Sequence, residues 1–183
     1  MRIFSDLSEQ TKEVLKWGAG RALRLRETMR GRRSRPLFVL AHMRSGSTLL
    51  LHLLVDHSAV EGYGERNHAY RSSTDLDRLR VDVCYRSGRW WRSPRYVADQ
   101  VNHDRYTPGS ELVRASGARC VILIREPEAA IGSMVQVLGR HYPDLTLERA
   151  VAHYENRLSS LRELAGSLSR GPGPSNVYFL TYE

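Results

Sequence analysis

The stretch that decides the fold is Pro36-Leu-Phe-Val-Leu-Ala41, followed by the polar loop His42-Met-Arg-Ser-Gly-Ser47 and the strongly apolar segment Thr48 to Val55. A continuous apolar run of this length is typical of a strand buried on both faces, as in a parallel sheet. The loop leads directly into an apolar segment that is long enough for a helix. Strand, tight loop and helix are the first half of a βαβ unit, so this stretch predicts an α/β fold.

The rest of the chain alternates strand-like with helix-like segments. Because such alternation is typical of a parallel sheet, we expect a three-layer α/β fold in which a parallel β-sheet is flanked by helices. Residues 60–118 are the least regular part, with a short helix expected around Leu76 to Val83. Elsewhere we expect strands at 96–101, 119–124 and 176–181, and helices at 5–30, 48–55, 110–116, 127–138 and 146–168.

Length and composition bound the class of protein. The chain has 183 residues, 41% of them hydrophobic and 26% charged, which suits one globular domain with a core. No apolar run approaches the ~20 residues of a membrane helix, so we expect no transmembrane segment. The two cysteines, Cys84 and Cys120, are too few for a disulfide framework. Reduced thiols lead us to expect a cytoplasmic protein.

The positive charge is concentrated near the amino terminus. The net charge is +8, and residues 21–35 alone hold seven arginines against one acid, Glu27. We therefore divide the chain into a basic N-terminal helix or arm, residues 1–35, and an α/β domain, residues 36–183. A nucleic-acid-binding or membrane-binding module built on residues 21–35 is one alternative. We expect no specific nucleic acid at the domain itself.

The loop between the first strand and its helix has the features of a phosphate site. Backbone N–H groups at a helix start carry partial positive charge and favour an anion. Gly46 lets the backbone approach closely, and Ser45, Ser47 and Thr48 add hydroxyl donors. Arg44 adds a full charge with a planar fork. A polar turn that binds nothing is the plain alternative, because short motifs have many false positives.

The loop departs from that of a nucleotide triphosphatase at one position. Such an enzyme has Gly-Lys-[Ser/Thr], with the lysine on the β- and γ-phosphates. Here Ser47 follows Gly46, and the cation lies inside the loop at Arg44. A relative of the P-loop kinases therefore stays an alternative that this departure disfavours.

The strand at 119–124 supplies a second cation. It ends in Arg125, where a magnesium-dependent P-loop enzyme needs a carboxylate. Ser133 follows two helical turns into the next helix. Since the carboxyl edge of a parallel sheet is where ligands bind, two anion sites are expected there. That arrangement suits a nucleotide with phosphates at two positions, held without a metal.

Three segments resemble the PAPS-dependent sulfotransferases, where PAPS is 3′-phosphoadenosine 5′-phosphosulfate. MRSGSTLL (43–50) looks like their 5′-phosphosulfate-binding loop. ILIREPEAAIGSM (122–134) is similar to their 3′-phosphate-binding segment. VYFLTYE (177–183) resembles the third strand and its terminal Tyr-Glu. The resemblance covers residues 36–183 and implies the P-loop NTPase-like fold of these enzymes.

The resemblance implies a function as well. The chain would transfer a sulfuryl group from PAPS to a hydroxyl or amine of an unidentified small-molecule or carbohydrate acceptor, without a metal. Arg44 would neutralise charge on the bridging oxygen, and the loop would hold the 5′-phosphate. Arg125 and Ser133 would hold the 3′-phosphate, with Tyr182 near the adenine.

A general base must take the proton of the acceptor. His103 lies 22 residues before Arg125, much as the catalytic histidine precedes its arginine in one branch of the family. Glu65 falls just after the first helix of the domain, where other branches have a catalytic glutamate. A surface histidine and a solvated turn acid are the plain alternatives, and the residues leave both candidates open.

Family members continue beyond the Tyr-Glu strand, whereas this sequence stops at Glu183. We therefore expect that a C-terminal portion of the domain is missing. An inactive or fragmentary domain that still binds the nucleotide product is a further alternative.

Overall fold

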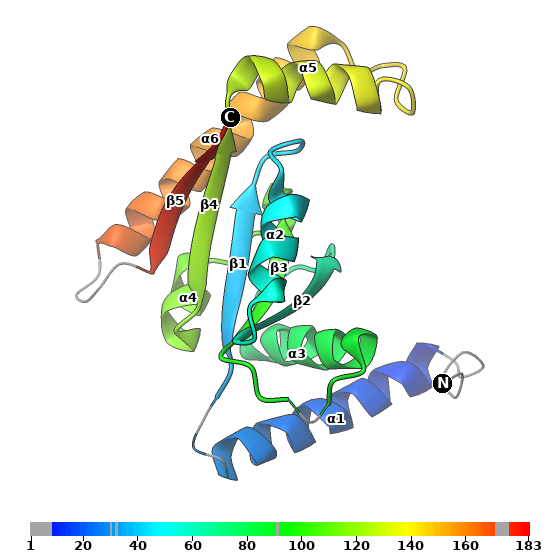
Figure 1. The fold of residues 1–183 in the computed structure, drawn as a ribbon, viewed down its shortest axis with the longest axis vertical. Coiled ribbons are helices and arrows are strands. Elements are labelled where there is room, and N and C mark those ends of the chain that lie inside the picture. Colours follow the sequence, from blue (N-terminus) through cyan, green and yellow to red (C-terminus); the bar gives the residue numbers. More distant parts are fainter. Residues whose placement is uncertain (1–8, 30, 32, 91, 171–175) are drawn as a thin grey trace.

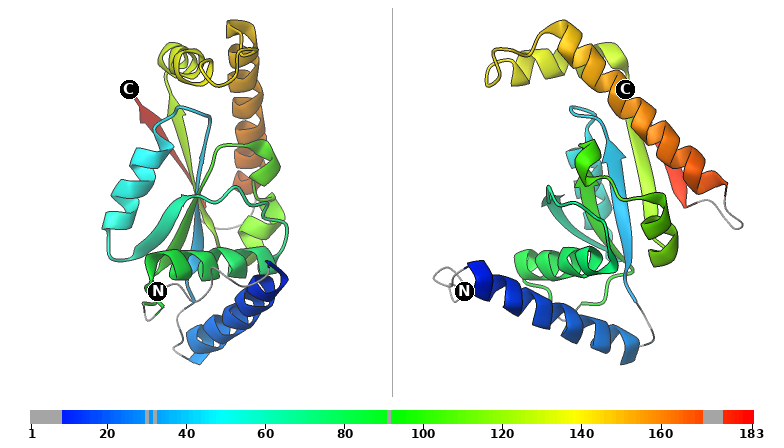
Figure 2. Two further views of the ribbon diagram at one scale, coloured as in Figure 1. Left: turned by 90° about the vertical axis from the view of Figure 1, so that its right-hand side faces the viewer. Right: turned by 180° about the vertical axis from the view of Figure 1, so that it is seen from behind.

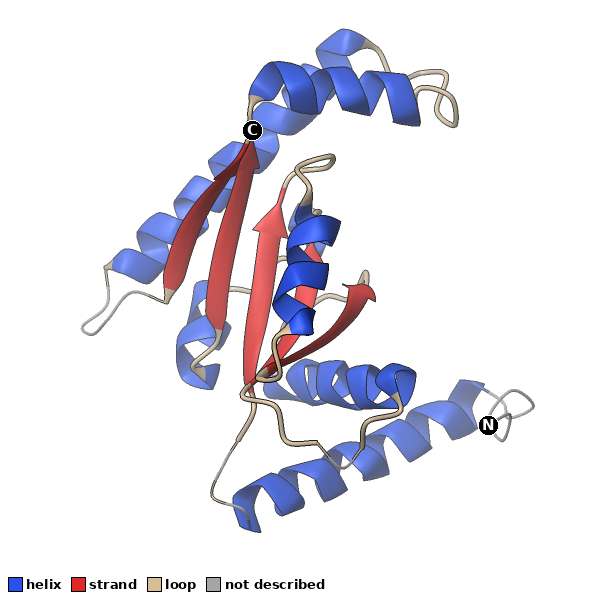
Figure 3. Cartoon of the chain, viewed as in Figure 1, coloured by secondary structure: helices blue, strands red, loops and turns tan. Residues whose placement is uncertain are grey.

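The computed structural model of the chain describes residues 9–29, 31, 33–90, 92–170 and 176–183. Its sheet has five strands, and all neighbours run parallel (Figure 3). The strands are β1 (Arg35–Ala41), β2 (Val60–Glu65), β3 (Tyr96–Val101), β4 (Arg119–Arg125) and β5 (Val177–Tyr182). Their order across the sheet is β2-β3-β1-β4-β5, which puts β1 at the centre (Figure 1). The predicted α/β fold with a parallel sheet is confirmed.

Helices connect the strands and lie close to where periodicity and caps predict them. Thr146 caps the long α6 by accepting a hydrogen bond from the backbone N–H of Arg149. The helix expected around Leu76 is longer than predicted, and part of the helix expected at 5–30 lies outside the described residues. The helices are α1 (Glu9–Met29), α2 (Ser47–Asp56), α3 (Ser73–Ser87), the 3₁₀ turn η1 (Asp104–Tyr106), α4 (Ser110–Ser116), α5 (Pro127–Leu138) and α6 (Leu147–Ser169).

The strand β2 is the one element of the sheet that we did not predict from the sequence. Two glycines and two acids interrupt its apolar pattern, so it does not read as a buried strand. Gly62 is needed for its packing, because a Cβ there would lie 2.9 Å from the carbonyl oxygen of Ala98 on β3. Because the two backbones approach closely, glycine occupies a position where an apolar side chain would otherwise indicate a strand.

The sheet is covered on both faces, as in a three-layer fold (Figure 2). On one face α2 packs its Leu51 against Leu37 and Val39 of β1. On the other face α3, α4 and α6 cover the sheet, with Leu161 of α6 in the same cluster as Phe38. Burial on both faces explains why β1 reads as a continuous apolar run.

The strands all point the same way, so their carboxyl ends form one edge of the sheet (Figure 1). Beyond that edge lies α5, which packs against α6. The helix α1 lies at the opposite end of the molecule and packs against α3. The part of the basic segment that lies on α1, residues 21–29, is therefore remote from the edge at which the predicted site residues end their strands.

A buried ion pair ties α1 to the domain. Glu27 lies 3.5 Å from Arg80 of α3, and both side chains are buried. Glu27 also accepts a hydrogen bond from the backbone N–H of Ser34, just before β1. The only acid of residues 21–35 is thus neutralised inside the protein. The division of the chain at residue 35 stays a prediction.

Arg157 of α6 holds the carboxyl ends of two strands together. It is 1% exposed, and its Nε–H donates to the carbonyl oxygen of Ala41 at the end of β1, at 2.9 Å. A terminal N–H donates to the carbonyl oxygen of Val101 at the end of β3, at 2.8 Å. The other terminal nitrogen donates to the Thr107 hydroxyl, at 2.7 Å, and to the carboxylate of Asp104. One guanidinium group therefore fixes the starting points of both loops.

Asp99 is a buried carboxyl group on β3. It accepts hydrogen bonds from the hydroxyl of Tyr70, at 2.5 Å, and from the backbone N–H of Arg66, at 3.1 Å. These bonds hold the segment that follows β2 against the sheet. Burial raises the pKa of Asp99 to about 7, although the hydrogen bonds from Tyr70 and Arg66 act in the opposite direction.

The substitution Asp99→Asn is predicted to remove one source of pH dependence. The folded state binds the proton of Asp99 more tightly than the unfolded state, so its contribution to stability falls as pH rises from 3.8 to about 7. The variant should gain stability relative to the unmodified protein as pH rises through this window. Thermal unfolding at several pH values measures the difference, and a difference that is constant with pH would contradict the prediction.

The substitution Arg157→Met is predicted to lower the free energy of unfolding by roughly 3 to 5 kcal/mol, because buried acceptors on two strands lose their donors. Urea unfolding followed by circular dichroism measures the loss. Arg162→Met, at an exposed position of the same helix, is the matched control and should change stability by less than about 0.5 kcal/mol. Equal effects of the two substitutions would refute the role given to Arg157.

Candidate functional site

A cavity of about 370 Å³ opens at the carboxyl edge of the sheet. Its walls come from the loop after β1, the ends of β2 and β5, the ends of β3 and β4, and the end of α5. Most of the residues predicted from sequence line it: Arg44, Gly46, Ser47, Thr48, Glu65, His103, Arg125 and Tyr182. Met43, Gln100, Asn102 and Leu138, which were not predicted, complete the wall. The sheet thus brings together residues that lie far apart in the sequence.

The loop after β1 has a backbone suited to bind an anion. Arg44 and Gly46 both have positive φ, 64° and 86°. A positive φ is uncommon for a residue with a side chain, and such residues cluster at functional sites. A Cβ on Gly46 would lie 3.1 Å from the Tyr182 ring, so a side chain there would also crowd that ring.

The amino end of α2 is not satisfied by a capping side chain. Its N-cap residue is Gly46, and its first turn contains no acid. The first N–H groups of a helix have no partner within it. At α2 these groups start at the wall of the cavity, so this helix end is a candidate position for an anion.

The two predicted cations lie side by side. The Arg125 guanidinium donates to the carbonyl oxygen of Arg44, at 3.1 Å, and lies 5.3 Å from the centre of the Tyr182 ring. The Nε–H of Arg44 donates to the Ser133 hydroxyl of α5, also at 3.1 Å. Ser133 therefore contacts Arg44, although Ser133 does not line the cavity.

Ser45 has a different place from its neighbours in the loop. It is fully buried, and it is not among the residues that line the cavity. Its hydroxyl oxygen has no hydrogen-bond partner in the part of the chain that the structure describes. The structure therefore does not bring the side chain of Ser45 to the cavity with the other loop residues.

His42, which we did not predict as a site residue, joins the loop to β4. Its Nε2 accepts the backbone N–H of Arg125, at 3.1 Å, so the Nδ1–H donates to the carbonyl oxygen of Met43, at 2.9 Å. Tyr154 of α6 packs its ring on His42 and donates its hydroxyl to the carbonyl oxygen of Arg125, at 2.8 Å. Both backbone groups of Arg125 are thereby fixed relative to the loop.

The imidazole of His42 is held in its neutral form. Burial lowers its pKa, and the positive charges of Arg157 and Arg125 lower it further, against the hydrogen bond to Met43. A neutral ring is what the geometry needs, because a protonated Nε2 could not accept the N–H of Arg125.

Glu65 is connected to the phosphate loop through Asn102. The side-chain N–H of Asn102 donates to Glu65 Oε2, at 3.1 Å, and the Ser47 hydroxyl donates to Asn102 Oδ1, at 3.1 Å. Glu65 Oε1 is buried and accepts no hydrogen bond within the described residues. Glu65 is therefore the last residue of β2 and belongs to a hydrogen-bonded network with Asn102 and Ser47, so it is not a solvated acid in a turn.

His103 faces the same cavity from the start of η1. Its ring is 6.1 Å from the ring of Tyr106 and 6.4 Å from that of His153, measured between centres. Burial lowers the pKa of His153, and the neighbouring His103 lowers it further. Both candidate bases therefore line one cavity.

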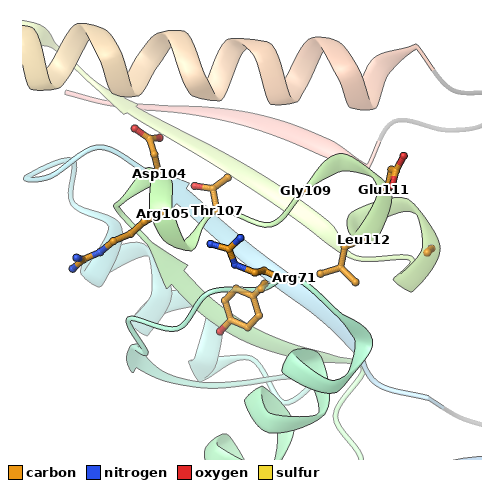
Figure 4. Close-up of a pocket in the computed structure, with 9 residues that line it drawn as sticks. Arg71, Asp104, Arg105, Thr107, Gly109, Glu111 and Leu112 are labelled. Atoms are coloured by element: carbon orange, nitrogen blue, oxygen red, sulfur yellow. The ribbon is translucent and has the colours of Figure 1, made fainter.

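A larger cavity, of about 600 Å³, is lined in part by Asp104 and Arg105 of η1 (Figure 4). Arg71, Arg105 and Glu111 are among its lining residues, and none of the residues that line it belongs to the loop after β1. His103 and Asp104 are consecutive, and each lines a different cavity. The turn η1 is thus the partition between the two.

Two searches of the described residues gave negative results. No group of three or more His, Cys, Asp or Glu side chains there could hold a metal ion. None of the described helices has the length and apolarity to cross a membrane.

Several solved structures resemble this chain. One of them, a sulfotransferase domain from the curacin biosynthetic pathway, aligns with a TM-score of 0.49 and 16% sequence identity, over 82% of this chain and 68% of that domain. The sequence matches no protein-family model and no curated protein. At this level of similarity, the residues of the cavity, and not the likeness, determine which reaction can be proposed for it.

Proposed function

We propose that this protein is a sulfotransferase, which moves a sulfuryl group from PAPS to a hydroxyl or amine of a small molecule or carbohydrate. One observation carries the proposal. The uncapped amino end of α2 and the guanidinium groups of Arg44 and Arg125 share a single cavity. Three anion-binding groups at the ends of two neighbouring strands fit a ligand with several separate negative groups better than a single phosphate.

The donor nucleotide is accounted for group by group. The 5′-phosphosulfate lies at the N–H groups that start at Gly46, with the hydroxyls of Ser47 and Thr48 as further donors. The 3′-phosphate lies at Arg125, close to Ser133. The Tyr182 ring, which packs on Gly46 and on the Arg125 guanidinium, offers a face for the adenine.

The transfer needs a stabilised leaving group. The acceptor oxygen or nitrogen forms a bond to sulfur while the bond from sulfur to the bridging oxygen breaks, and that electron pair leaves with the nucleotide as 3′-phosphoadenosine 5′-phosphate (PAP). Arg44 is placed inside the loop, where its charge opposes the negative charge that develops on the bridging oxygen. Ser133 sets the position of Arg44 through its hydrogen bond.

Glu65 is the general base that the geometry favours. One of its oxygens is fixed by Asn102, and the other, which is buried, accepts no hydrogen bond within the described residues, so its capacity to accept the acceptor proton is unused. For His103, ring contacts with Tyr106 and His153 are seen, but no hydrogen bond from its ring is found in the described residues. We therefore propose Glu65 as the base and His103 as a side wall of the acceptor site.

Binding of PAP is the first test. Calorimetry should show that the unmodified protein binds PAP without added metal. The substitutions Arg44→Ala and Arg125→Ala should each weaken binding by about 10- to 100-fold, because each removes charge-assisted hydrogen bonds. Arg105→Ala is the matched control, since Arg105 lines the other cavity. A folded protein that ignores PAP but transfers phosphate from Mg·ATP would point to the kinase alternative instead.

Turnover distinguishes the two bases. In a screen of hydroxylated acceptors with PAPS, Glu65→Gln should lower kcat by about 10²- to 10⁴-fold with PAP affinity unchanged, as expected for loss of a general base. His103→Gln should have a much smaller effect. The reverse order would make His103 the base. Tight PAP binding without turnover of any acceptor would favour a nucleotide-binding domain that is inactive by itself.

A further inference from the structure

We propose that Asn102 is a positioning residue, which couples the phosphate loop to the carboxylate of Glu65 and sets both the orientation and the charge state of that group. The inference rests on the proposed function, because it assigns Asn102 a role in that reaction. No feature of the sequence alone singled out this side chain.

The order of the strands makes Asn102 the natural link. The phosphate loop follows β1, Glu65 ends β2, and β3 lies between these two strands. Asn102 directly follows β3, so its side chain can reach both neighbours at once. The two hydrogen bonds, each 3.1 Å long, connect residues 47, 102 and 65 across the sheet edge.

The direction of both hydrogen bonds follows from the chemistry of the groups. An ionised carboxylate only accepts hydrogen bonds, so the amide nitrogen of Asn102 must face Glu65. The amide oxygen then faces Ser47, whose hydroxyl must be the donor. Ser47 thus fixes which way the amide of Asn102 points, and the amide fixes one oxygen of Glu65.

Burial gives these hydrogen bonds their influence. Asn102 is 8% exposed and Ser47 is 5% exposed, so water cannot readily replace either partner. A donor that bonds to the charged form of a carboxyl group favours that form. Asn102 therefore fixes Oε2 of Glu65, while Oε1 accepts no hydrogen bond within the described residues.

Several other charges act on Glu65, and the test must hold them constant. Arg157 of α6 interacts with Glu65 electrostatically. Arg44, Arg125 and His103 share its cavity, while the neighbouring Arg66 is engaged with Asp82, at 2.7 Å. A substitution at Asn102 leaves all of these groups in place, so a change in the titration of Glu65 arises from the change at position 102.

The experiment replaces the amide by a group of the same shape. Asn102→Asp removes the donor and puts a like charge beside Glu65, so the pKa of Glu65 should rise by about one unit or more. Carbon-13 NMR of labelled glutamate carboxyl groups measures that pKa, with the Glu65 signal identified by its absence in Glu65→Gln. Asn156→Asp, the same change at an exposed position of α6, is the control and should leave the signal unmoved.

If Asn102→Asp does not fold, a second variant, Ser47→Ala, tests the same hydrogen-bonded link. Ser47→Ala releases the amide oxygen, so it should raise the pKa of Glu65 in the same direction by a smaller amount. With an acceptor found by the PAPS screen, the acidic limb of the kcat profile should shift by the same amount as the NMR titration.

The outcomes separate this inference from the proposed function. If the unmodified protein binds PAP and the Glu65 titration is the same in Asn102→Asp and Ser47→Ala as in the unmodified protein, the positioning role is wrong and the sulfotransferase proposal stands. If the Glu65 titration shifts as expected but the protein binds no PAP, the coupling is real and the proposed function fails.

Discussion

The site depends on the guanidinium group of Arg157, buried beneath the carboxyl edge of the sheet. It satisfies the last carbonyl oxygens of β1 and β3, from which the phosphate loop and the Asn102–His103 segment begin. One turn earlier on α6, Tyr154 satisfies the carbonyl oxygen of Arg125 at the end of β4. A single helix therefore sets three strand ends relative to one another, and the groups that line the cavity inherit that arrangement.

The charge balance around the cavity follows from the same packing. Arg157 is largely compensated by Asp104 and by carbonyl oxygens, and His42 is kept neutral by burial. Arg44 and Arg125 remain as cations at the cavity wall, joined there by the positive end of α2. The positive charge at the cavity thus comes from individually placed groups, not from the net charge of the chain. The helix α1, which carries Arg21, Arg24 and Arg26, lies toward the other end of the molecule.

Much of the fold could be predicted because its strands carry strong local signals. The runs at β1 and β4 are continuous because both faces of the sheet are covered, and Thr146 marks the start of α6. The strand β2 could not be predicted, since Gly62 serves a close approach to β3 and no apolar pattern remains. The loop motif alone does not tell which of its side chains reach the cavity, because Ser45 is buried away from it while its neighbours Arg44 and Gly46 line it.

The sequence by itself determined the α/β class and pointed to the loop around Gly46, with Arg44 and Arg125, as a candidate phosphate site, because these are short local patterns with fixed geometry. Only the tertiary structure decided how those residues combine. The strand order brought Glu65 and Asn102 beside Ser47, and α6 inserted Arg157 beneath them. Such contacts join residues that are tens of positions apart, so they depend on packing and hydrogen-bond satisfaction, which no local pattern encodes.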